Sequence, residues 1–231
     1  MTGEQGVTGE QGLRERKRQR THDAISAAAI SLFVERGFDR VSVAEVAAAA
    51  EVSKPTLFKY FSTKEDLVLH RIADHRGESA RVVRGRRPGE APLAALRRHF
   101  LDGLDRHDPV TGLNDDPRVL AYHGMVFSTP SLAARVAGHA AAEEAALADA
   151  LDDAAGTRRD ERGRPEPGAR PDGLTGRLAA AQIVAAQRVL ARDNWRRLTE
   201  GCTAARAHPE AVAAADHAFT LLDAGLAPYR D

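Results

Sequence analysis

At 231 residues the chain is long enough to bury a substantial core, as one large domain or as a small domain joined to a larger one. Its 33 basic residues are balanced by 33 acidic ones, which excludes binding to nucleic acid through an overall positive charge; any such binding must come from a local cluster. A single cysteine, Cys202, excludes an internal disulfide, and no apolar run has the length of a membrane span or the form of a secretion signal. We therefore expect a cytoplasmic protein with no membrane partner.

The chain reads as all-α, with about nine helices, because strand-like alternation is nearly absent and Ala, Leu, Arg and Glu dominate. Residues 1–13 repeat the sequence TGEQG and predict a disordered tail. The basic arm at 13–20 leads into a helix that ends at Gly37. This arm has two readings, a contact with DNA or a solvated extension of the first helix, and the sequence leaves both open.

Two short helices with clear start signals follow. Ser42 with Glu45 three residues later predicts a capping box, and Ser53 predicts the start of another short helix that runs to about Phe61. A fourth helix is expected from Thr63. Two short capped helices joined by a turn of about four residues are typical of a helix-turn-helix, with its motif at 42–61 here.

The second helix of this pair is expected to expose Lys54, Thr56, Lys59 and Tyr60. Their hydroxyl, ammonium and phenol groups suit base edges and phosphates in a major groove. Leu57 and Phe61, one turn apart, are expected to face the core. All four lysines of the chain lie within its first 64 residues, which indicates positions that need an ammonium, with chance as the alternative. They are Lys17, Lys54, Lys59 and Lys64.

Residues 14–75, roughly a quarter of the chain, resemble the DNA-binding domain of the TetR family of regulators. The matching pieces are Arg36-Gly37-Phe38, Ser42-Val43, Val52-Ser53, Thr56-Leu57-Phe58, Tyr60-Phe61 and Thr63-Lys64-Glu65-Asp66-Leu67. The resemblance implies an N-terminal three-helix DNA-binding domain, with Tyr60 and Lys64 on phosphates. The full set of DNA-binding residues that it implies is Ser42, Ser53, Lys54, Thr56, Lys59, Tyr60 and Lys64.

Three positions depart from the family pattern. Glu51 replaces the usual glycine of the turn, which removes the easiest route to a positive φ. Pro55 stands where small residues are usual, although proline is tolerated in a first helical turn. Phe58 replaces the usual tyrosine and so lacks a hydroxyl for a phosphate. These departures concern details of contact rather than the presence of the motif.

The remainder, residues 76–231, is predicted to be a larger helical domain that binds a ligand and dimerises, as the family plan implies. Residues 76–89 read as a helix end and a connector. Residues 156–173 are rich in Gly, Pro and charge and predict a mobile loop. Helices are expected at about 92–106, 117–127, 130–154, 174–201 and 208–227.

The last two predicted helices suggest a homodimer. The first is apolar on nearly every face, and the second has apolar residues at spacings of 3 and 4, like a coiled-coil seam. The alternative is that both helices only complete the core of one subunit. The residues expected at the interface are Val189, Val212, Phe219 and Leu222.

A pocket for an unknown small-molecule effector is harder to locate. Polar groups among apolar ones typically mark a binding site, and His139 and Glu143 are spaced to pair on one helix face. For each candidate, an ordinary core or surface role is the competing interpretation. The candidates are Phe100, Tyr122, His123, Val126, His139, Gln187 and Trp195.

Enzymatic readings find no support in the sequence, so we expect no catalytic residues, no cofactor and no metal. His70 and His75 are five apart and do not share a helix face, and no HExxH, CxxC, GxSxG or glycine-rich phosphate loop is present. The expected function is a repressor of the TetR type that a small molecule releases from double-stranded operator DNA. A ligand-independent regulator or activator, or an enzyme with a DNA-binding head, is the alternative.

Overall fold

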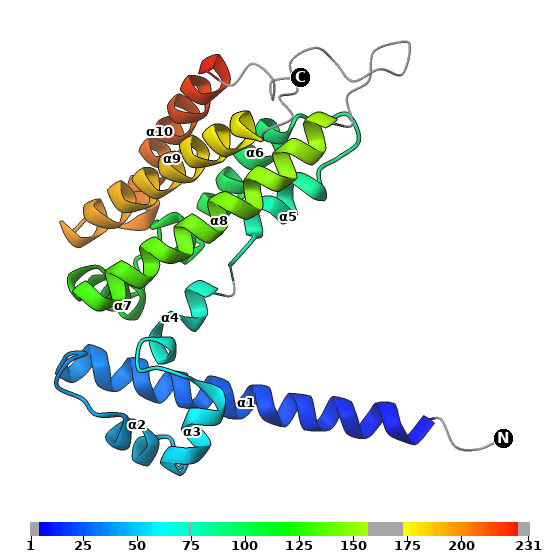
Figure 1. The fold of residues 1–231 in the computed structure, drawn as a ribbon. Helices are drawn as coiled ribbons and strands as arrows, with labels where there is room; N and C mark the ends of the chain where they lie inside the picture. The colour runs from blue at the N-terminus through cyan, green and yellow to red at the C-terminus, as the bar shows by residue number, and fades with distance from the viewer. Residues whose placement is uncertain (1–4, 74, 157–172, 226–231) are drawn as a thin grey trace. The chain divides into compact units, whose positions relative to one another are not determined.

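The computed structural model describes residues 5–73, 75–156 and 173–225 and is all-helical over them, as predicted (Figure 1). The described residues contain ten α-helices and one 3-10 helix, against about nine helices expected. The predicted loop at 156–173 lies almost entirely outside the described residues. Within the described ranges, no helix has the combination of length and apolar character that a membrane crossing requires.

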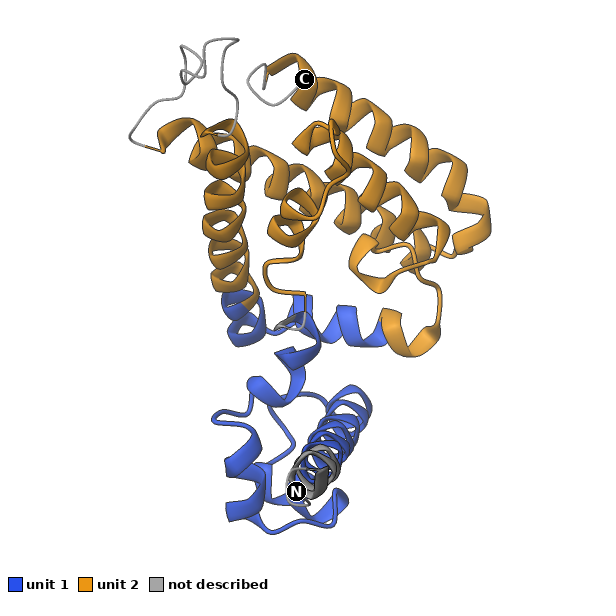
Figure 2. Cartoon of the chain, turned by 90° about the vertical axis from the view of Figure 1, so that its right-hand side faces the viewer, with its two compact units in different colours: residues 1–74, 121–135 blue, residues 75–120, 136–231 orange. Residues whose placement is uncertain are grey.

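The chain divides into two compact units (Figure 2). Unit 1 contains residues 1–74 and 121–135, and unit 2 contains residues 75–120 and 136–231. Two long helices, α7 (Pro117–Ser128) and α8 (Pro130–Gly156), contribute to both units. Both begin at the proline that the sequence predicts for a first helical position, where a missing N–H costs nothing.

Unit 1 is built on α1 (Gln5–Arg36), α2 (Val43–Ala49), α3 (Lys54–Tyr60) and α4 (Asp66–Ala73). Each of these four helices contributes fully or nearly fully buried apolar side chains to one core, because its apolar residues recur at helical spacing. Among these core residues are Ile25, Phe33, Val46, Leu57 and Leu67.

The prediction of a disordered tail at 1–13 is wrong for residues 5–13, because α1 begins at Gln5. Residues 1–4 lie outside the described part of the chain. Adding residues to an existing helix needs no new nucleus, so the helix can extend through this segment although Gly6, Gly9 and Gly12 each disfavour it.

Unit 2 consists of α5 (Glu78–Arg84), α6 (Pro92–Asp105), the 3-10 helix η1 (Pro109–Thr111), α9 (Leu174–Thr199), α10 (Ala204–Gly225) and parts of α7 and α8. Its core lies between α6, α8, α9 and α10. The expected connector at 76–89 contains α5, which buries Ser79, Ala80 and Val83 on one face. A helix this short carries too little periodic signal to be recognised in the sequence.

Helix α10 begins four residues before the predicted start at 208. The carboxylate of Asp115 accepts a hydrogen bond of 2.8 Å from the Ala204 N–H, and the Thr203 carbonyl accepts from Arg206 and Ala207. These acceptors satisfy N–H groups that a helix start leaves unpaired. Pro209 therefore lies inside the helix instead of opening it.

A close backbone contact joins η1 to α9. Gly112 has a φ of +72°, and a Cβ at this position would lie 1.9 Å from the carbonyl oxygen of Ala191. Next to it, the buried side chain of Asn194 donates a hydrogen bond of 2.9 Å to the Thr111 carbonyl. The close backbone contact and the Asn194 hydrogen bond together hold α9 against the 3-10 turn within unit 2.

The expected dimerisation residues divide into two groups. Phe219 and Leu222 are buried in the core of unit 2, with side chains 3% and 8% exposed, and Val212 packs against that core. Placing these residues of α10 on an outer seam was therefore wrong, because their face of the helix packs against their own subunit. Val189 of α9, by contrast, is 65% exposed.

Candidate nucleic-acid interface

Helix α2 begins with the predicted capping box. The Ser42 hydroxyl accepts from the Glu45 N–H at 3.2 Å, while a carboxylate oxygen of Glu45 accepts from the Ser42 N–H at 2.8 Å. The hydrogen bond from the Ser42 backbone lowers the pKa of Glu45. The cap holds Ser42 at the exposed start of α2, so its hydroxyl serves first as a structural group.

The turn between α2 and α3 keeps a left-handed residue without a glycine. Glu51 has a φ of +54°, its N–H donates to the Ala48 carbonyl, and the Val52 N–H donates to the Ala47 carbonyl. These bonds close the end of α2 and hold Glu51 in a conformation that costs an L-residue about 1–2 kcal/mol. Glu51 in place of the usual glycine therefore raises the energy of the turn, which still has a residue of positive φ at this position.

Helix α3 is held in place by a cap at its start and by buried side chains on its inner face. The Ser53 hydroxyl accepts from the Thr56 N–H at 3.2 Å and lies 2.7 Å from the Thr56 hydroxyl. Leu57 and Phe61 are buried, as predicted. Both lysines of the helix, Lys54 and Lys59, are exposed. This short helix therefore exposes two cations to solvent, with its start capped by Ser53 and its inner face anchored by Leu57.

Phe58 of α3 is exposed, a feature that the sequence analysis does not predict. Phe58 is 45% exposed, although its residue type favours the core. It directly follows the buried Leu57, and this position was the signal that it would point outward. An exposed ring between two exposed lysines can contact the apolar edge of a base, such as the thymine methyl group.

Tyr60 and Lys64 occupy less open positions. Tyr60 is half-buried, with its ring 6.4 Å from that of His22. The Lys64 ammonium donates to the Phe38 carbonyl at 2.5 Å and lies 4.5 Å from the centroid of the Phe38 ring. An ammonium has three N–H donors, so Lys64 links the loop after α1 to the start of α4 and keeps donors for a further acceptor.

The start of α4 carries a second reciprocal cap. The Thr63 hydroxyl accepts from the Asp66 N–H at 3.2 Å, and the Asp66 carboxylate accepts from the Thr63 N–H at 3.0 Å. The helix proper begins at Asp66, three residues after the predicted start, with Thr63 in the capping position.

The region with this geometry also matches a known family model. The model described as "Bacterial regulatory proteins, tetR family" matches residues 25–70, from the second half of α1 into α4. Residues 25–70 thus form an N-terminal domain of the TetR-family type. The helix-turn-helix of α2 and α3 lies at the centre of the matched range.

Individual relatives extend this finding. TcmR of Streptomyces glaucescens, an HTH-type transcriptional regulator, is 33% identical over 125 residues, which are 53% of this chain and 55% of that protein. The chain spans about half or less of the length of the curated relatives that it matches. The chain is thus similar, over part of its length, to proteins named as HTH-type transcriptional regulators.

Two solved structures share the fold over most of the chain. NalD of Pseudomonas aeruginosa, the secondary repressor of the MexAB-OprM multidrug efflux pump, is 20% identical with a TM-score of 0.57, covering 87% of this chain and 97% of NalD. FadR of Bacillus subtilis, solved in complex with stearoyl-CoA, is 16% identical with a TM-score of 0.51, covering 86% and 96%. At these identities the likeness shows the fold, an N-terminal helix-turn-helix domain followed by a helical domain.

The candidate ligand residues of this chain divide between the two units. In unit 1, the Tyr122 hydroxyl donates to the Val68 carbonyl at 3.0 Å, and burial raises the pKa of Tyr122 to about 12. Burial also lowers the pKa of His123 to about 4, and its ring lies 5.7 Å from that of Phe127. Val126 is fully buried. In unit 1, Tyr122 and Val126 are core residues.

The other four candidates lie in unit 2. Phe100 is buried with its ring 6.3 Å from that of Phe219, and Gln187 is half-buried on α9. His139 Nε2 accepts from Arg76 at 2.5 Å, and the Arg192 guanidinium lies 5.9 Å from the Trp195 ring.

Glu143, predicted as a possible partner of His139, accepts from the N–H groups of Gly77 and Ser79 at the start of α5. His139 and Glu143 share one face of α8, as predicted. That face contacts the segment that begins α5.

Proposed function

We propose that this chain is a DNA-binding transcriptional repressor that a small-molecule effector releases from its operator. The observation that carries the proposal is α3, whose exposed Lys54, Phe58 and Lys59 lie on a helix capped by Ser53 and anchored by Leu57. A helix of this kind fits the major groove, where side chains reach base edges and phosphates.

The DNA-contacting residues of the proposal are those that the family resemblance implies. Lys54, at the N-terminal end of α3, is the proposed reader of a base edge, and Lys59 and Tyr60 are proposed to contact phosphates. Ser42 and Ser53 would contribute hydroxyl oxygens that already cap helices, and Thr56 would contribute a hydroxyl that pairs with that of Ser53. Lys64 would bind a phosphate with the N–H donors that its bond to Phe38 does not use.

The proposal includes a homodimer, formed by faces of α9 and α10 that differ in part from those expected. Leu178 and Val189 of α9 and Leu221 of α10 are all more than half exposed, and α9 and α10 pack side by side (Figure 1). Leu178 and Val189 are eleven residues apart, three helical turns, so they share one face. Two copies of this pair of helices would bury that apolar surface in a four-helix interface.

A symmetric dimer would present two copies of α3 to a near-palindromic operator, with half-sites about 34–36 Å apart or a multiple of it. Repression and release by a ligand are supported by analogy with neighbours of the same fold. NalD is named a repressor, and FadR is solved with stearoyl-CoA. The effector of this chain would act by binding two arrangements of the dimer unequally.

The operator is first located by footprinting, as the DNA that this protein protects. DNA binding is then tested by titrating that operator and unrelated DNA at several salt concentrations. Lys54→Ala should cost about 1–3 kcal/mol on the operator and change the preference at one symmetric base position. Lys59→Ala should weaken binding to both DNAs and lower the salt slope by about one.

Lys64→Ala should also lower the salt slope and, in addition, reduce thermal stability through its lost bond to Phe38. Arg206→Ala removes an exposed charge from α10 in unit 2 and should bind as the parent does. If Lys54→Ala and Lys59→Ala bind both DNAs as tightly as the parent, α3 is not the DNA-contacting helix.

A further inference from the structure

Two helices of unit 1 bring three potential metal ligands together. His22 and Asp23 of α1 and His70 of α4 each offer one donor atom, and these atoms all lie within 4.8 Å of one another. Among the described residues, this is the one group of three or more His, Cys, Asp or Glu side chains so placed. No local pattern predicts this group, because His22 and His70 are 48 positions apart and match no known ligand spacing.

His70 is held by a buried serine. The Ser26 hydroxyl donates to the Leu67 carbonyl at 3.0 Å, and its oxygen lies 2.9 Å from His70 Nδ1. When Nδ1 donates to this oxygen, Nε2 carries the lone pair of the ring. In metal sites, a hydrogen bond at one ring nitrogen commonly fixes the other as the ligand.

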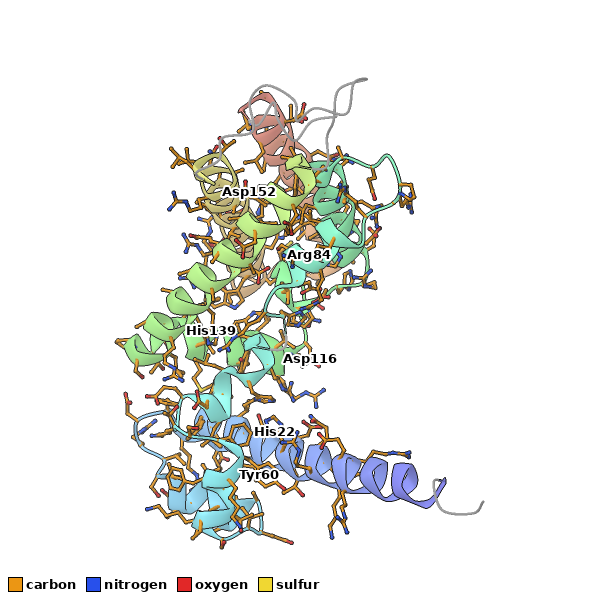
Figure 3. The ribbon with its side chains drawn as sticks, turned by 45° about the vertical axis from the view of Figure 1, so that its right-hand side comes forward. His22, Tyr60, Arg84, Asp116, His139 and Asp152 are labelled. Atoms are coloured by element: carbon orange, nitrogen blue, oxygen red, sulfur yellow. The ribbon has the colours of Figure 1, made fainter. Side chains whose placement is uncertain are left out.

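The other two side chains are also held in place. Gln19 donates to Asp23 Oδ1 at 2.8 Å, and His22 Nδ1 lies 3.3 Å from that same oxygen. The His22 ring stacks on Phe61 with centroids 4.4 Å apart, and it meets the His70 ring edge-on at 5.0 Å. Figure 3 shows His22 on α1 near Tyr60 of α3.

We propose that His22, Asp23 and His70 bind a divalent first-row transition-metal ion of the Zn²⁺ type, with solvent as the remaining ligand. Two imidazoles and a carboxylate are donors that such ions accept, and three protein ligands with one open position make a known tetrahedral arrangement. Ligands at about 2.0–2.2 Å from a tetrahedral ion lie about 3.4 Å apart. The His22–Asp23 separation already has that value, and the widest pair must close by roughly 1.4 Å or less.

A bound ion would join α1 to α4 beside Phe61, the residue that ends α3. Because the ion would bind the folded unit and not the unfolded chain, it should raise the thermal midpoint of unit 1. The site is independent of the proposed repressor function, since binding of the ion can be measured without DNA.

The experiment is a calorimetric titration of the full chain with ZnCl2 at neutral pH, together with thermal melting with and without Zn²⁺. The parent should bind one ion per chain and melt at a higher temperature with it. His22→Gln, Asp23→Asn and His70→Gln should each weaken binding by more than about tenfold, since even outer residues of metal sites cost 10–100-fold when changed.

The matched control is His208→Gln. His208 also pairs with an aspartate, Asp105, at 2.8 Å, but the pair belongs to no group of three ligands among the described residues. Binding in this variant should equal that of the parent. Ser26→Ala leaves all three ligands in place but removes the acceptor at His70 Nδ1, and it should weaken binding by about 10–100-fold.

Circular dichroism of each variant checks the fold. If His70→Gln unfolds, the test rests on His22→Gln and Asp23→Asn, which change partly exposed residues of α1. A parent that binds no Zn²⁺ overturns the proposal. So does equal binding by the parent and by folded His22→Gln and Asp23→Asn, which would leave the three side chains with an ordinary packing role.

Discussion

Helices α3 and α10 differ in what they expose: α3 presents lysine side chains to solvent, whereas α10 presents the apolar Leu221. In α3, Leu57 is buried and Lys54 and Lys59 are exposed, as predicted. In α10, Phe219 and Leu222 were expected on an outer seam and lie in the core of their own subunit. A stripe at helical spacing shows that a face is buried, but it does not show which surface covers it.

The largest expected effect tests the inner face of α10. Phe219→Asp should unfold unit 2, because removing a buried phenylalanine alone costs about 3–5 kcal/mol and a buried unpaired carboxylate adds to that cost. Thermal melting and far-ultraviolet circular dichroism of the full chain measure the loss. If Phe219→Asp were a folded monomer, Phe219 would belong to the dimer interface that the sequence predicts, and α10 would no longer contrast with α3.

The outer faces are tested by Leu221→Asp and Val189→Asp. Both side chains are more than 60% exposed in the single chain, so both variants should stay folded, with melting close to that of the parent. At micromolar concentration the parent should scatter light as a dimer and the variants as monomers. Variants that remain dimeric would place the interface on another surface.

A smaller effect is expected at the cap of α3. Ser53→Ala removes the acceptor for the Thr56 N–H and should lower the free energy of unfolding by about 0.5–2 kcal/mol in chemical denaturation. Thr199→Ala is the control, since the Thr199 hydroxyl only donates to a carbonyl at the end of α9. Equal stability of Ser53→Ala and the parent would mean that α3 is held by Leu57 and Phe61 alone.

The smallest effect compares one carboxylate from each unit. Hydrogen bonds from His99 and His75 lower the pKa of Glu78 in unit 2 to about 2, whereas the lowered pKa of Glu45 in unit 1 belongs to a more exposed carboxylate at a helix cap. A depressed carboxylate pKa stabilises the fold above the unfolded value near 4.5, and this contribution is lost as the pH falls toward about 2.

Denaturation of the parent and of Glu78→Gln across this range should therefore show a stability difference that shrinks as the pH falls. Glu45→Gln should change stability less at every pH, because its carboxylate is open to solvent. A Glu78→Gln difference that does not vary with pH would show that the two histidines do not favour the ionised carboxylate.

What the sequence could predict depends on the distance over which each signal acts. The caps of α2 and α3 are complete within four residues, so Ser42 with Glu45 and Ser53 with Thr56 were readable along the chain. The start of α10 was not, because its first N–H is satisfied by Asp115, 89 residues earlier. Local hydrogen bonds can be inferred from spacing, while long-range ones need the fold.

The same distinction applies to the site. Exposure of Lys54 and Lys59 followed from the helical phase set by Leu57, whereas the bond of Lys64 to the Phe38 carbonyl spans 26 residues and had no local sign. The prediction of the ligand residues depends on polar groups that lie among apolar ones in the sequence. That pattern selects equally for side chains with a structural partner, such as Tyr122 on the Val68 carbonyl.

The contact of Gly112 with the backbone of α9 has a consequence for how this chain can vary. Any side chain at position 112 would collide with the Ala191 carbonyl, so only glycine lets the turn after η1 approach the backbone of α9 this closely. In a saturation screen, position 112 should therefore tolerate no substitution, while Gly138, with open space around it, should accept many.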